Sequence, residues 1–587
     1  MLGGGRGRAW RARLAAAGLL GGALLLPAAA QANIEVEVSG VSGAMKANAE
    51  AYLSIRDAAN QKDLDQATVD RLQRQAGPEL REALRPFGYY NPFIDARLEG
   101  TAPKWKAQYI IHPGPRTVWK RVDIQISGEG AADFEKELKR MHRRLQEGEG
   151  ILHSDYDEAK AILSSAAYAR GYLDAQYAEA ELRVTPADNS AEAVLHFDTG
   201  PRYRFGEFSI EQTGERPLED AFLRRYVKIH AGADYDPQKL LDTQFALSDL
   251  GYFQSVEMLP QREQAQDHQV PILIRTTPRK SQRYDFGIGY GTDTGVRGSV
   301  ASDFRHLNDT GHSLHVETQV SHIKNTAAGE YRIPRGDKPG EMFTLNGVLG
   351  QQDYSAGLSR FYGFGAGLAR TPGKWQRRYY LKYLHEDSTL GEDVTAADML
   401  MPGLTLNRAS LDDAIYARQG WSLFFDVHGA VKDAMSSVSF TQAHLIVKGA
   451  YPLWQRTRLL ARYETGANLV DQFSRLPASQ RFFAGGDQSV RGYDYQSIGP
   501  RDANGAVVGG NFLTTMSLEL ETRVYGNWGA ATFYDAGGVE NHVSPKLKQG
   551  IGVGLRYRAP IGSVQIDLAH PVEDNGVRLH IGVRVGL

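Results

Sequence analysis

The sequence predicts an α+β region followed by an all-β membrane region in one chain. Residues 33 to 280 contain three similar units with both helical and strand periodicity. From residue 281 to the terminus only the alternation typical of β-strands remains. We therefore expect three tandem β-α-α-β-β domains and a C-terminal, 16-stranded transmembrane β-barrel.

The composition excludes several other classes of protein. Of the 587 residues, 23% are charged and the formal net charge is −2, which argues against a nucleic-acid protein built on a basic face. Cysteine is absent, which excludes disulfides, thiolate metal sites and cysteine nucleophiles. The mean hydropathy of −0.40 is too polar for a bundle of membrane helices, but barrel strands are apolar only at alternate positions.

The N-terminus has the pattern of an export signal. Four arginines between positions 6 and 13 precede an apolar run at 14–26, and small residues follow at 28–32. The apolar run is shorter than the roughly 20 residues that a membrane-spanning helix needs. We interpret residues 1–32 as a signal peptide and expect the mature chain to begin near Asn33.

Two markers recur in the same order in each of the three units. Gly88, Gly171 and Gly251 each end a helical pattern, and a tyrosine follows each of them. A glycine there suits a helix end that needs a left-handed residue. Pro-Arg pairs at 115–116, 201–202 and 278–279 follow the glycines in turn. The repetition predicts one structural unit used three times.

The second unit shows the predicted order of elements. Its strands are expected at 118–126, 176–184 and 192–198, and its helices at 132–146 and 155–170. Ser154 and Asp155 are expected to cap the second helix. In the third unit Asp236 and Pro237 are the expected N-cap and first helical residue. In the first unit we expect Gly77-Pro78 to interrupt the second helix.

The last 300 or so residues alternate strictly between apolar and polar positions. The pattern is clearest at 284–290, 421–427, 551–557, 564–568 and 577–585. The polar phase carries charged residues and many glycines, which suits a wet lumen better than the inner face of a sandwich. At roughly 19 residues per strand and connection, this region gives ~16 strands.

A long connection at about 471–511 carries the most distinctive motif, FFAGGDQSVRGY at 482–493. Glu519 shares the polar phase of a later strand with Ser517, and Asp535 precedes a pair of glycines near a strand end. Both carboxylates are expected to face the lumen. A guanidinium can hold two carboxylate oxygens in a planar fork. The alternative is an exposed arginine in a mobile loop. The residues of the motif that we single out are Gly485, Gly486, Asp487, Val490, Arg491, Gly492 and Tyr493.

These features resemble the outer-membrane assembly superfamily that includes BamA and TamA. In that superfamily the loop folds into the barrel and its arginine pairs with carboxylates of the inner wall. The matching positions here are Arg491, Glu519 and Asp535. Three units rather than five or two, the length and the loop are most similar to the TamA-like branch. The resemblance implies a signal peptide at 1–32, POTRA domains at 33–114, 115–200 and 201–279, and an outer-membrane β-barrel at 280–587.

The same resemblance implies a role, a place and partners. The barrel would lie in the outer membrane of a Gram-negative cell, with the POTRA domains in the periplasm. It would help to insert outer-membrane proteins such as autotransporters and would act on outer-membrane lipid as well. Its partners would be a TamB-like, inner-membrane-anchored periplasmic protein and unfolded outer-membrane protein clients. We expect no cofactor, no metal, no nucleic acid and no enzymatic activity.

The proposed mechanism depends on a lateral seam. Closing the barrel requires the first strand, about 282–291, to pair with the last, about 577–585. We hypothesise that this seam opens and that its edges template a client strand. The seam residues are Phe286, Gly287, Ile288, Gly289, Leu579, Ile581, Gly582 and Val583. One alternative is a two-partner-type polypeptide secretion pore, whose members usually have two POTRA domains and a plug helix. Another is a passive porin.

Overall fold

The computed structural model describes residues 33–59, 64–214, 217–371, 373–560 and 562–584. The chain divides into two compact units, one up to Arg202 and one from Tyr203 onward. The expected signal peptide at 1–32 lies outside the described residues. In the described part of the chain, no helix is both long and apolar enough to cross a membrane.

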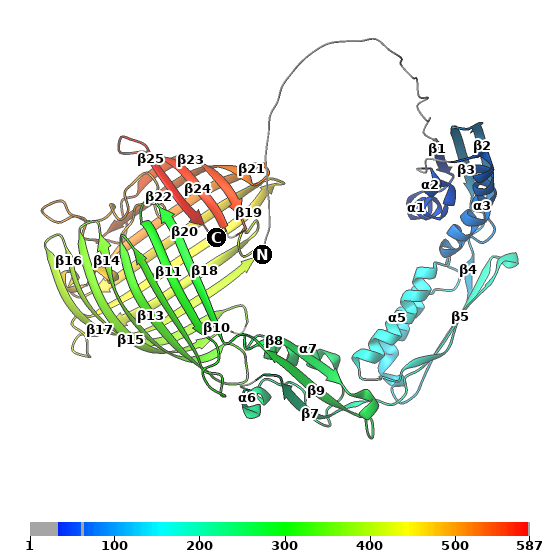
Figure 1. Cartoon of the computed structure of the whole chain (residues 1–587), viewed down its shortest axis with the longest axis horizontal. Coiled ribbons are helices and arrows are strands. Elements are labelled where there is room, and N and C mark those ends of the chain that lie inside the picture. Colours follow the sequence, from blue (N-terminus) through cyan, green and yellow to red (C-terminus); the bar gives the residue numbers. More distant parts are fainter. Residues whose placement is uncertain (1–32, 60–63, 215–216, 372, 561, 585–587) are drawn as a thin grey trace, which may run out of the picture. The chain divides into compact units, whose positions relative to one another are not determined.

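The first domain is a three-stranded sheet with its helices on one face (Figure 1). The strand order is β1-β3-β2, with β1 and β3 parallel and β2 antiparallel to β3. Alternate residues of β3, among them Trp105, Tyr109 and Ile111, are buried against the helices. The elements are β1 (Asn33–Ser39), α1 (Gly43–Tyr52), α2 (Ser54–Ala58), α3 (Gln66–Leu84), η1 (Arg85–Phe87), β2 (Phe93–Thr101) and β3 (Lys104–His112).

The helix α3 corrects one prediction, because Gly77-Pro78 does not interrupt it. Proline removes the hydrogen bond to the carbonyl of Arg74, four residues earlier. Arg74 and Pro78 are both exposed, so water can satisfy that carbonyl. The buried face of the helix runs through Leu72, Ala76 and Leu80 without a break, and this packing holds the helix together.

The second domain repeats this arrangement with the strand order β4-β6-β5. The prediction that Ser154 or Asp155 caps its long helix is wrong, because α5 begins at His153 and Leu152 occupies the N-cap. Asp155 instead pairs with Arg144 at 3.2 Å. The elements are β4 (Val118–Ser127), η2 (Ala131–Phe134), α4 (Glu135–Arg144), α5 (His153–Ala169), β5 (Gln176–Thr185), η3 (Pro186–Asp188) and β6 (Ser190–Asp198).

The third domain has the strand order β7-β9-β8. The predicted cap is confirmed here, since the Asp236 carboxylate accepts a hydrogen bond from the Gln238 amide at 2.9 Å and Pro237 is the first helical residue. The elements are β7 (Arg204–Gln212), α6 (Asp220–Arg224), α7 (Pro237–Ser248), β8 (Phe253–Pro260), η4 (Arg262–Gln264) and β9 (Gln269–Pro278).

The two repeated markers meet in the structure. Gly88, Gly171 and Gly251 all have left-handed backbones, with φ of 88°, 85° and 80°. The Arg116 side chain donates to the carbonyls of Phe87 and Ile151, at 3.1 and 2.9 Å. In the later units, the Arg202 side chain donates to the Arg170 carbonyl at 2.9 Å and the Arg279 amide donates to the Tyr252 carbonyl at 2.8 Å. The Pro-Arg segment thus holds the glycine turn in place.

We expect Gly88→Ala to destabilise the first unit. A left-handed backbone costs an alanine about 1–2 kcal/mol, and its Cβ would lie 2.7 Å from the Ile151 carbonyl oxygen. Gly77→Ala is the matched control, because its Cβ meets nothing within 4 Å in a helix interior. That change should stabilise by about 0.5–1 kcal/mol. Urea unfolding followed by helical circular dichroism measures both, and equal stability of the two variants would contradict the argument.

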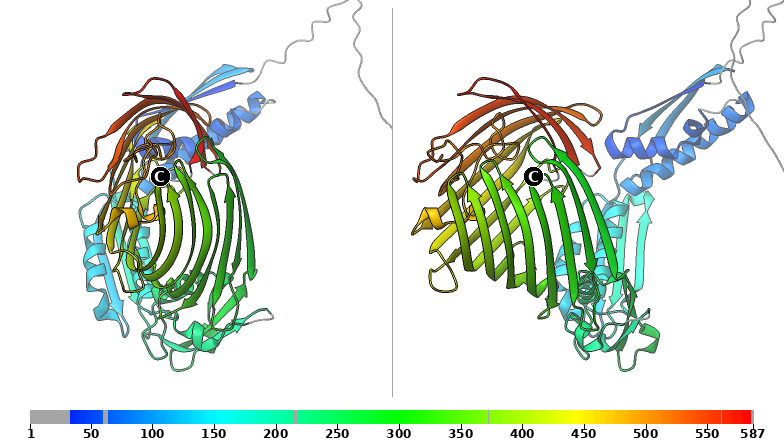
Figure 2. Two further views of the ribbon diagram at one scale, coloured as in Figure 1. Left: turned by 90° about the vertical axis from the view of Figure 1, so that its left-hand side faces the viewer. Right: turned by 60° about the vertical axis from the view of Figure 1, so that its left-hand side comes forward.

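The barrel is one antiparallel sheet of sixteen strands in sequence order, as predicted (Figures 1 and 2). Figure 2 shows the sheet curving round from its first strands in green to its last in red. Outward residues such as Phe286, Ile288, Phe364 and Leu568 are exposed and apolar. The strands are β10 (Gln282–Gly291), β11 (Gly295–Phe304), β12 (Ser313–Ser321), β13 (Lys324–Pro334), β14 (Glu341–Tyr354), β15 (Gly357–Arg370), β16 (Gln376–Leu390), β17 (Asp393–Leu411), β18 (Gly420–Ala430), β19 (Phe440–Trp454), β20 (Thr457–Val470), β21 (Phe512–Tyr525), β22 (Trp528–Glu540), β23 (Lys548–Ala559), β24 (Gly562–Pro571) and β25 (Arg578–Arg584).

The third domain contacts the barrel through turns between early strands. The Tyr252 hydroxyl donates to the Gly311 carbonyl in the turn between β11 and β12. The Phe222 ring and the Tyr252 hydroxyl lie so close to Gly311 that a Cβ there would meet both at under 3 Å. Lys228 donates to the Asp337 carbonyl, between β13 and β14, at 3.1 Å. These contacts fix the domain beside the first barrel strands.

Candidate functional site: the lumen loop and the seam

The connection between β20 and β21, residues 471–511, folds against the inside of the barrel wall. It contains two short turns, η5 (Phe473–Arg475) and η6 (Ala478–Gln480). Its apolar residues Phe482, Val490 and Tyr493 are buried and pack with Leu513 of β21 and Val539 of β22. The loop is therefore held by the strands that follow it in sequence.

Arg491 is a buried side chain of the loop, with 3% of its surface exposed. Its Nε and Nη2 donate to the two oxygens of Asp535 at 2.7 and 3.0 Å, which is the bidentate fork that a guanidinium favours. Nη1 donates to Glu519 at 2.9 Å. The structure thus brings together the three residues that the sequence singled out. The guanidinium also lies over the Phe533 ring, 3.3 Å from its centre.

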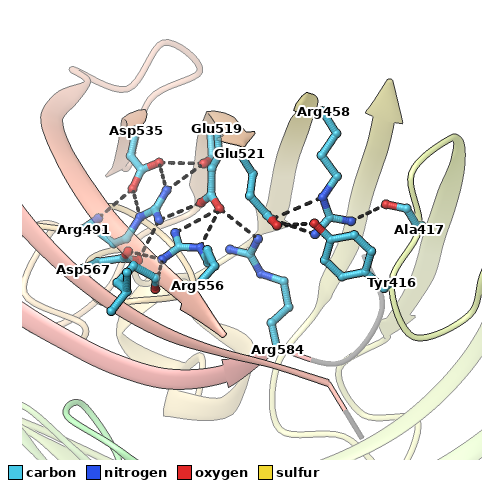
Figure 3. A network of polar contacts seen from close by, with 12 residues as sticks. Tyr416, Ala417, Arg458, Arg491, Glu519, Glu521, Asp535, Arg556, Asp567 and Arg584 are labelled. Carbon is cyan, nitrogen blue, oxygen red and sulfur yellow. Dashed lines mark hydrogen bonds and ion pairs between the residues drawn. The ribbon is translucent and has the colours of Figure 1, made fainter. Parts of the chain in front are cut away.

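Sequence reasoning missed three partners in this network (Figure 3). Asp567 of β24 accepts from Arg491 Nη1 at 3.0 Å. Arg556 of β23, which is fully buried, donates to Glu519 at 3.0 Å and also pairs with Asp567. Arg584 of β25 lies 3.5 Å from Glu519. Asp567 and Arg556 are polar members of alternating runs, so the pattern predicts that they face the lumen but not which charges meet.

The network balances its charges, with Arg491, Arg556 and Arg584 against Glu519, Asp535 and Asp567. A buried charge is costly unless it is paired and hydrogen-bonded. Beside it, Glu521 is held by Arg458 at 2.7 Å and by the Tyr416 hydroxyl (Figure 3). Arg558 also pairs with Glu521 at 3.3 Å. The wall from β20 to β25 therefore carries two neighbouring charge clusters on its inner side.

Glycines let the loop reach the wall. At Gly492 the backbone is left-handed, with φ of 100°, and a Cβ would lie 3.0 Å from the Pro571 nitrogen. At Gly550 of β23 a Cβ would lie 2.0 Å from the Arg491 carbonyl oxygen. Any larger residue at either position would push the loop off the wall. These contacts explain the Arg-Gly pair of the motif.

The start of the loop has its own anchors further round the barrel. Glu386 of β16, fully buried, accepts from the Ser479 amide at 2.9 Å and from Ser359 at 2.7 Å. Arg481 donates to Asp393 of β17 at 2.7 Å. The loop consequently spans the lumen between β16–β17 and β21–β25. Among the described residues, no group of three or more histidine and carboxylate side chains has a geometry that could hold a metal ion.

The seam differs from the expected strand pair. Within the described residues no ladder joins β10 to β25. The Thr292 amide, just beyond β10, donates to the Ile581 carbonyl at 3.2 Å, and the Ile581 amide donates to Thr292 Oγ1 at 3.2 Å. The Thr292 hydroxyl therefore accepts the Ile581 N–H, which in a regular ladder would be bonded to a backbone carbonyl of β10. Gly287, Gly289 and Gly582 add no side chains to support cross-strand packing.

The remaining seam residues border the lipid-facing side. Phe286 and Ile288 are 79% and 91% exposed, and Leu579 and Val583 are also exposed. Inside the barrel a cavity of about 320 Å³ lies between the loop and the seam. Its lining includes Gly291, Arg297, Asp487, Arg491, Gly582 and Arg584. The loop motif, the charge network and the seam therefore form one site.

Comparison with protein families places three segments of the chain. Residues 289–582 match the Omp85 superfamily domain. Residues 35–113 match the first POTRA domain of TamA, and residues 203–279 match a POTRA domain described as a surface antigen variable number repeat.

Curated relatives are outer-membrane protein assembly factors BamA. One from Neorickettsia risticii is 23% identical over 83% of this chain and 69% of its own length. One from Neisseria meningitidis serogroup B is 24% identical over 77% of this chain and 61% of its own length. The chain thus spans roughly two thirds of these relatives. The crystal structure of Haemophilus ducreyi BamA lacking POTRA domains 1–3 superposes with a TM-score of 0.66, at 18% identity, over 79% of this chain and 99% of that one.

The family match extends over half of the chain and agrees with the sixteen-stranded barrel and the three-stranded domains before it. Barrels of this kind with POTRA domains lie in the Gram-negative outer membrane, and their POTRA domains lie in the periplasm. This chain is a member of the Omp85 superfamily.

Proposed function

We propose that this protein is the outer-membrane component of a translocation and assembly module of the TamA type. It aids the insertion of outer-membrane proteins such as autotransporters, and acts on outer-membrane lipid in the same process. BamA relatives with this barrel are named as assembly factors, and the first-domain match is to TamA. We take 33–114, 115–200 and 201–279 as the limits of the POTRA domains and 280–587 as the barrel.

One observation carries this proposal: the lumen holds an anchored loop while, in the part of the chain that the structure describes, no ladder pairs the barrel's end strands. If an unfolded chain passed through the lumen, the loop would have to move away and break the five side-chain hydrogen bonds of Arg491. An unpaired strand edge, in contrast, is ready to accept another strand. The geometry favours a route through the wall over a route through the lumen.

The proposed mechanism uses backbone hydrogen bonding and no covalent chemistry. The seam between β10 and β25 opens, and its edges offer free N–H and C=O groups to a client strand. The residues involved are Phe286, Gly287, Ile288 and Gly289 on one side and Leu579, Ile581, Gly582 and Val583 on the other. The free energy of client folding drives insertion, so no nucleotide is needed.

The first POTRA domain is the proposed contact for a TamB-like, inner-membrane-anchored periplasmic protein. Its sheet has β1 and β2 as its edges in the described residues. Phe93, at the start of β2, is 68% exposed. An apolar side chain on an open sheet edge suits a partner that adds a strand.

In cells, a photo-crosslinker at Phe93 should trap one large, inner-membrane-anchored periplasmic protein. The matched control is a crosslinker at Arg81, which is exposed on α3 of the same domain but away from the sheet edge. Mass spectrometry of the trapped product identifies the partner. A single secreted polypeptide would favour the two-partner-type secretion pore instead. Soluble chaperones alone would favour a general assembly factor.

A further inference from the structure

The turn after the first barrel strand contacts both the last strand and the loop. Thr292 shares its two hydrogen bonds with Ile581 of β25. Next to it, the Asp293 carboxylate accepts from the Asp487 amide of the loop motif. The Asp293 side chain is 9% exposed, although it lies in a turn between two strands at the barrel's edge. The Asp293 side chain is thus covered by the loop and by the last strand.

Gly486 of the loop and His580 of β25 both lie close to the Asp293 carboxylate. Gly486 has φ of 102°, and a Cβ there would lie 2.6 Å from Asp293 Oδ2. His580 of β25 completes the enclosure, with its Nδ1 3.7 Å from Asp293 Oδ1. The Gly492 amide donates to His580 Nε2 at 3.1 Å, so this nitrogen is the unprotonated one. The ring therefore carries its proton on Nδ1, the nitrogen that lies nearest to Asp293.

These contacts link the two sides of the seam through the loop. On the late side, the loop is fixed by Arg491 to β21, β22 and β24 and by Gly492 to β25. On the early side, Gly486 and Asp487 hold the turn after β10. The span between the two attachments is only five residues of loop, from Asp487 to Arg491. A short segment anchored at both ends limits how far the two edges can separate.

We propose that Thr292, Asp293, Asp487, Gly492, His580 and Ile581 form a bracket across the seam, with Asp293 as its positioning residue. The bracket holds β10 against β25 in the closed barrel and must release before the edges separate. This inference rests on the proposed lateral opening and names the contact that controls it. Asp293 acts through the loop and not on any client directly.

The bracket also responds to pH. Both aspartates lie outside the strands. Burial and the nearby negative charge of Asp293 raise the pKa of Asp487 to about 6. Below that pH the Asp487 carboxyl group is protonated and neutral, so it is not repelled by the Asp293 carboxylate. Above it both carboxylates are charged and repel each other, so the bracket weakens as the pH rises through 6. Neighbouring titratable or charged groups are His580 of β25, Tyr495 of the loop, and Arg297, Lys448, Arg462 and Arg584, which line the adjoining cavity.

Spin labels on cysteines at Ile288 and Val583 measure the seam directly, because the chain has no other cysteine. Pulsed electron resonance gives the distance distribution in lipid nanodiscs at pH values below and above 6. The labelled parent should show more of the long distance at the higher pH. Asp293→Ala should raise the open-to-closed ratio about tenfold, the factor expected for one lost hydrogen bond to a charged acceptor. Asp293→Asn should restore the short distance at both pH values, because an amide accepts the Asp487 N–H and carries no charge.

Asp285→Asn is the matched control, since Asp285 pairs with Arg283 on the same β10 strand away from the bracket. It should leave the distances and their pH response unchanged. Distances in Asp293→Ala that equal those of the parent at both pH values would overturn the bracket. A pH response that persists in Asp293→Asn would overturn the role of the carboxylate pair. These readouts need no client, so they are independent of whether seam opening serves assembly.

Discussion

Arg491→Ala is expected to lower the stability of the barrel by about 3–5 kcal/mol. The change leaves Glu519, Asp535 and Asp567 with only two arginines inside the wall, and it removes the stacking on Phe533. The first two POTRA domains should stay folded, because each has a hydrophobic core of its own. Heat-dependent gel migration measures barrel stability, and immunoblotting of client proteins measures assembly.

Two arginine variants sharpen this test. Arg491→Lys keeps the charge but loses the bidentate fork, so we expect an intermediate loss. Arg501→Ala is the control, because Arg501 is exposed in the same loop and bonds only to nearby loop carbonyls. It should change stability by less than about 0.5 kcal/mol. Wild-type client levels in Arg491→Ala would show that the docked loop has no part in assembly.

Bridging the seam with a disulfide is expected to abolish assembly almost completely. Thr292→Cys with Ile581→Cys places the two thiols at a point where the edges share hydrogen bonds. The absence of native cysteine means that no other disulfide can form within the chain. Client levels should fall to those of cells that lack the protein and should recover on reduction.

The control for this experiment shares one of its cysteines. Ile566→Cys with Ile581→Cys joins register partners within the β24–β25 ladder, which stay together whether or not the seam opens. This bridge should leave assembly intact. Normal client levels with a fully oxidised Thr292–Ile581 bridge would rule out lateral opening as a step in assembly, while leaving the distance measurements on the Asp293 bracket valid.

Patterns that depend on local chemistry predicted most of the fold. Alternation predicted barrel strands because every barrel strand has one lipid-facing side, as at Phe286 and Ile288, and the length of the region predicted their number. The repeated Gly-Tyr pairs predicted helix ends because only a glycine adopts the left-handed backbone without strain. Pro78 misled the prediction for α3, since tertiary packing of Leu72, Ala76 and Leu80 outweighs one lost hydrogen bond.

The contacts of the site were harder to predict from the sequence, because they depend on the register between strands. Arg491, Glu519 and Asp535 were singled out by resemblance to a family motif. Asp567 and Arg556 sit on β24 and β23, and their meeting depends on the register of strands far from the loop in sequence. Asp155 was misread for a similar reason, because its partner Arg144 lies on a different helix. Local sequence determines which side a residue faces, whereas contacts across elements need the assembled sheet.

The ligands of Arg491 have a consequence for the order in which the barrel forms. They come from β21, β22 and β24, and Arg556 of β23 lies between them. A slip of one residue in any of these strands would turn its charged side chain toward lipid and leave the arginine without that partner. The receptor for the loop therefore exists only after four strands have paired in the right alignment. Docking of the loop is in this sense a proofreading step for the part of the wall from β21 to β24.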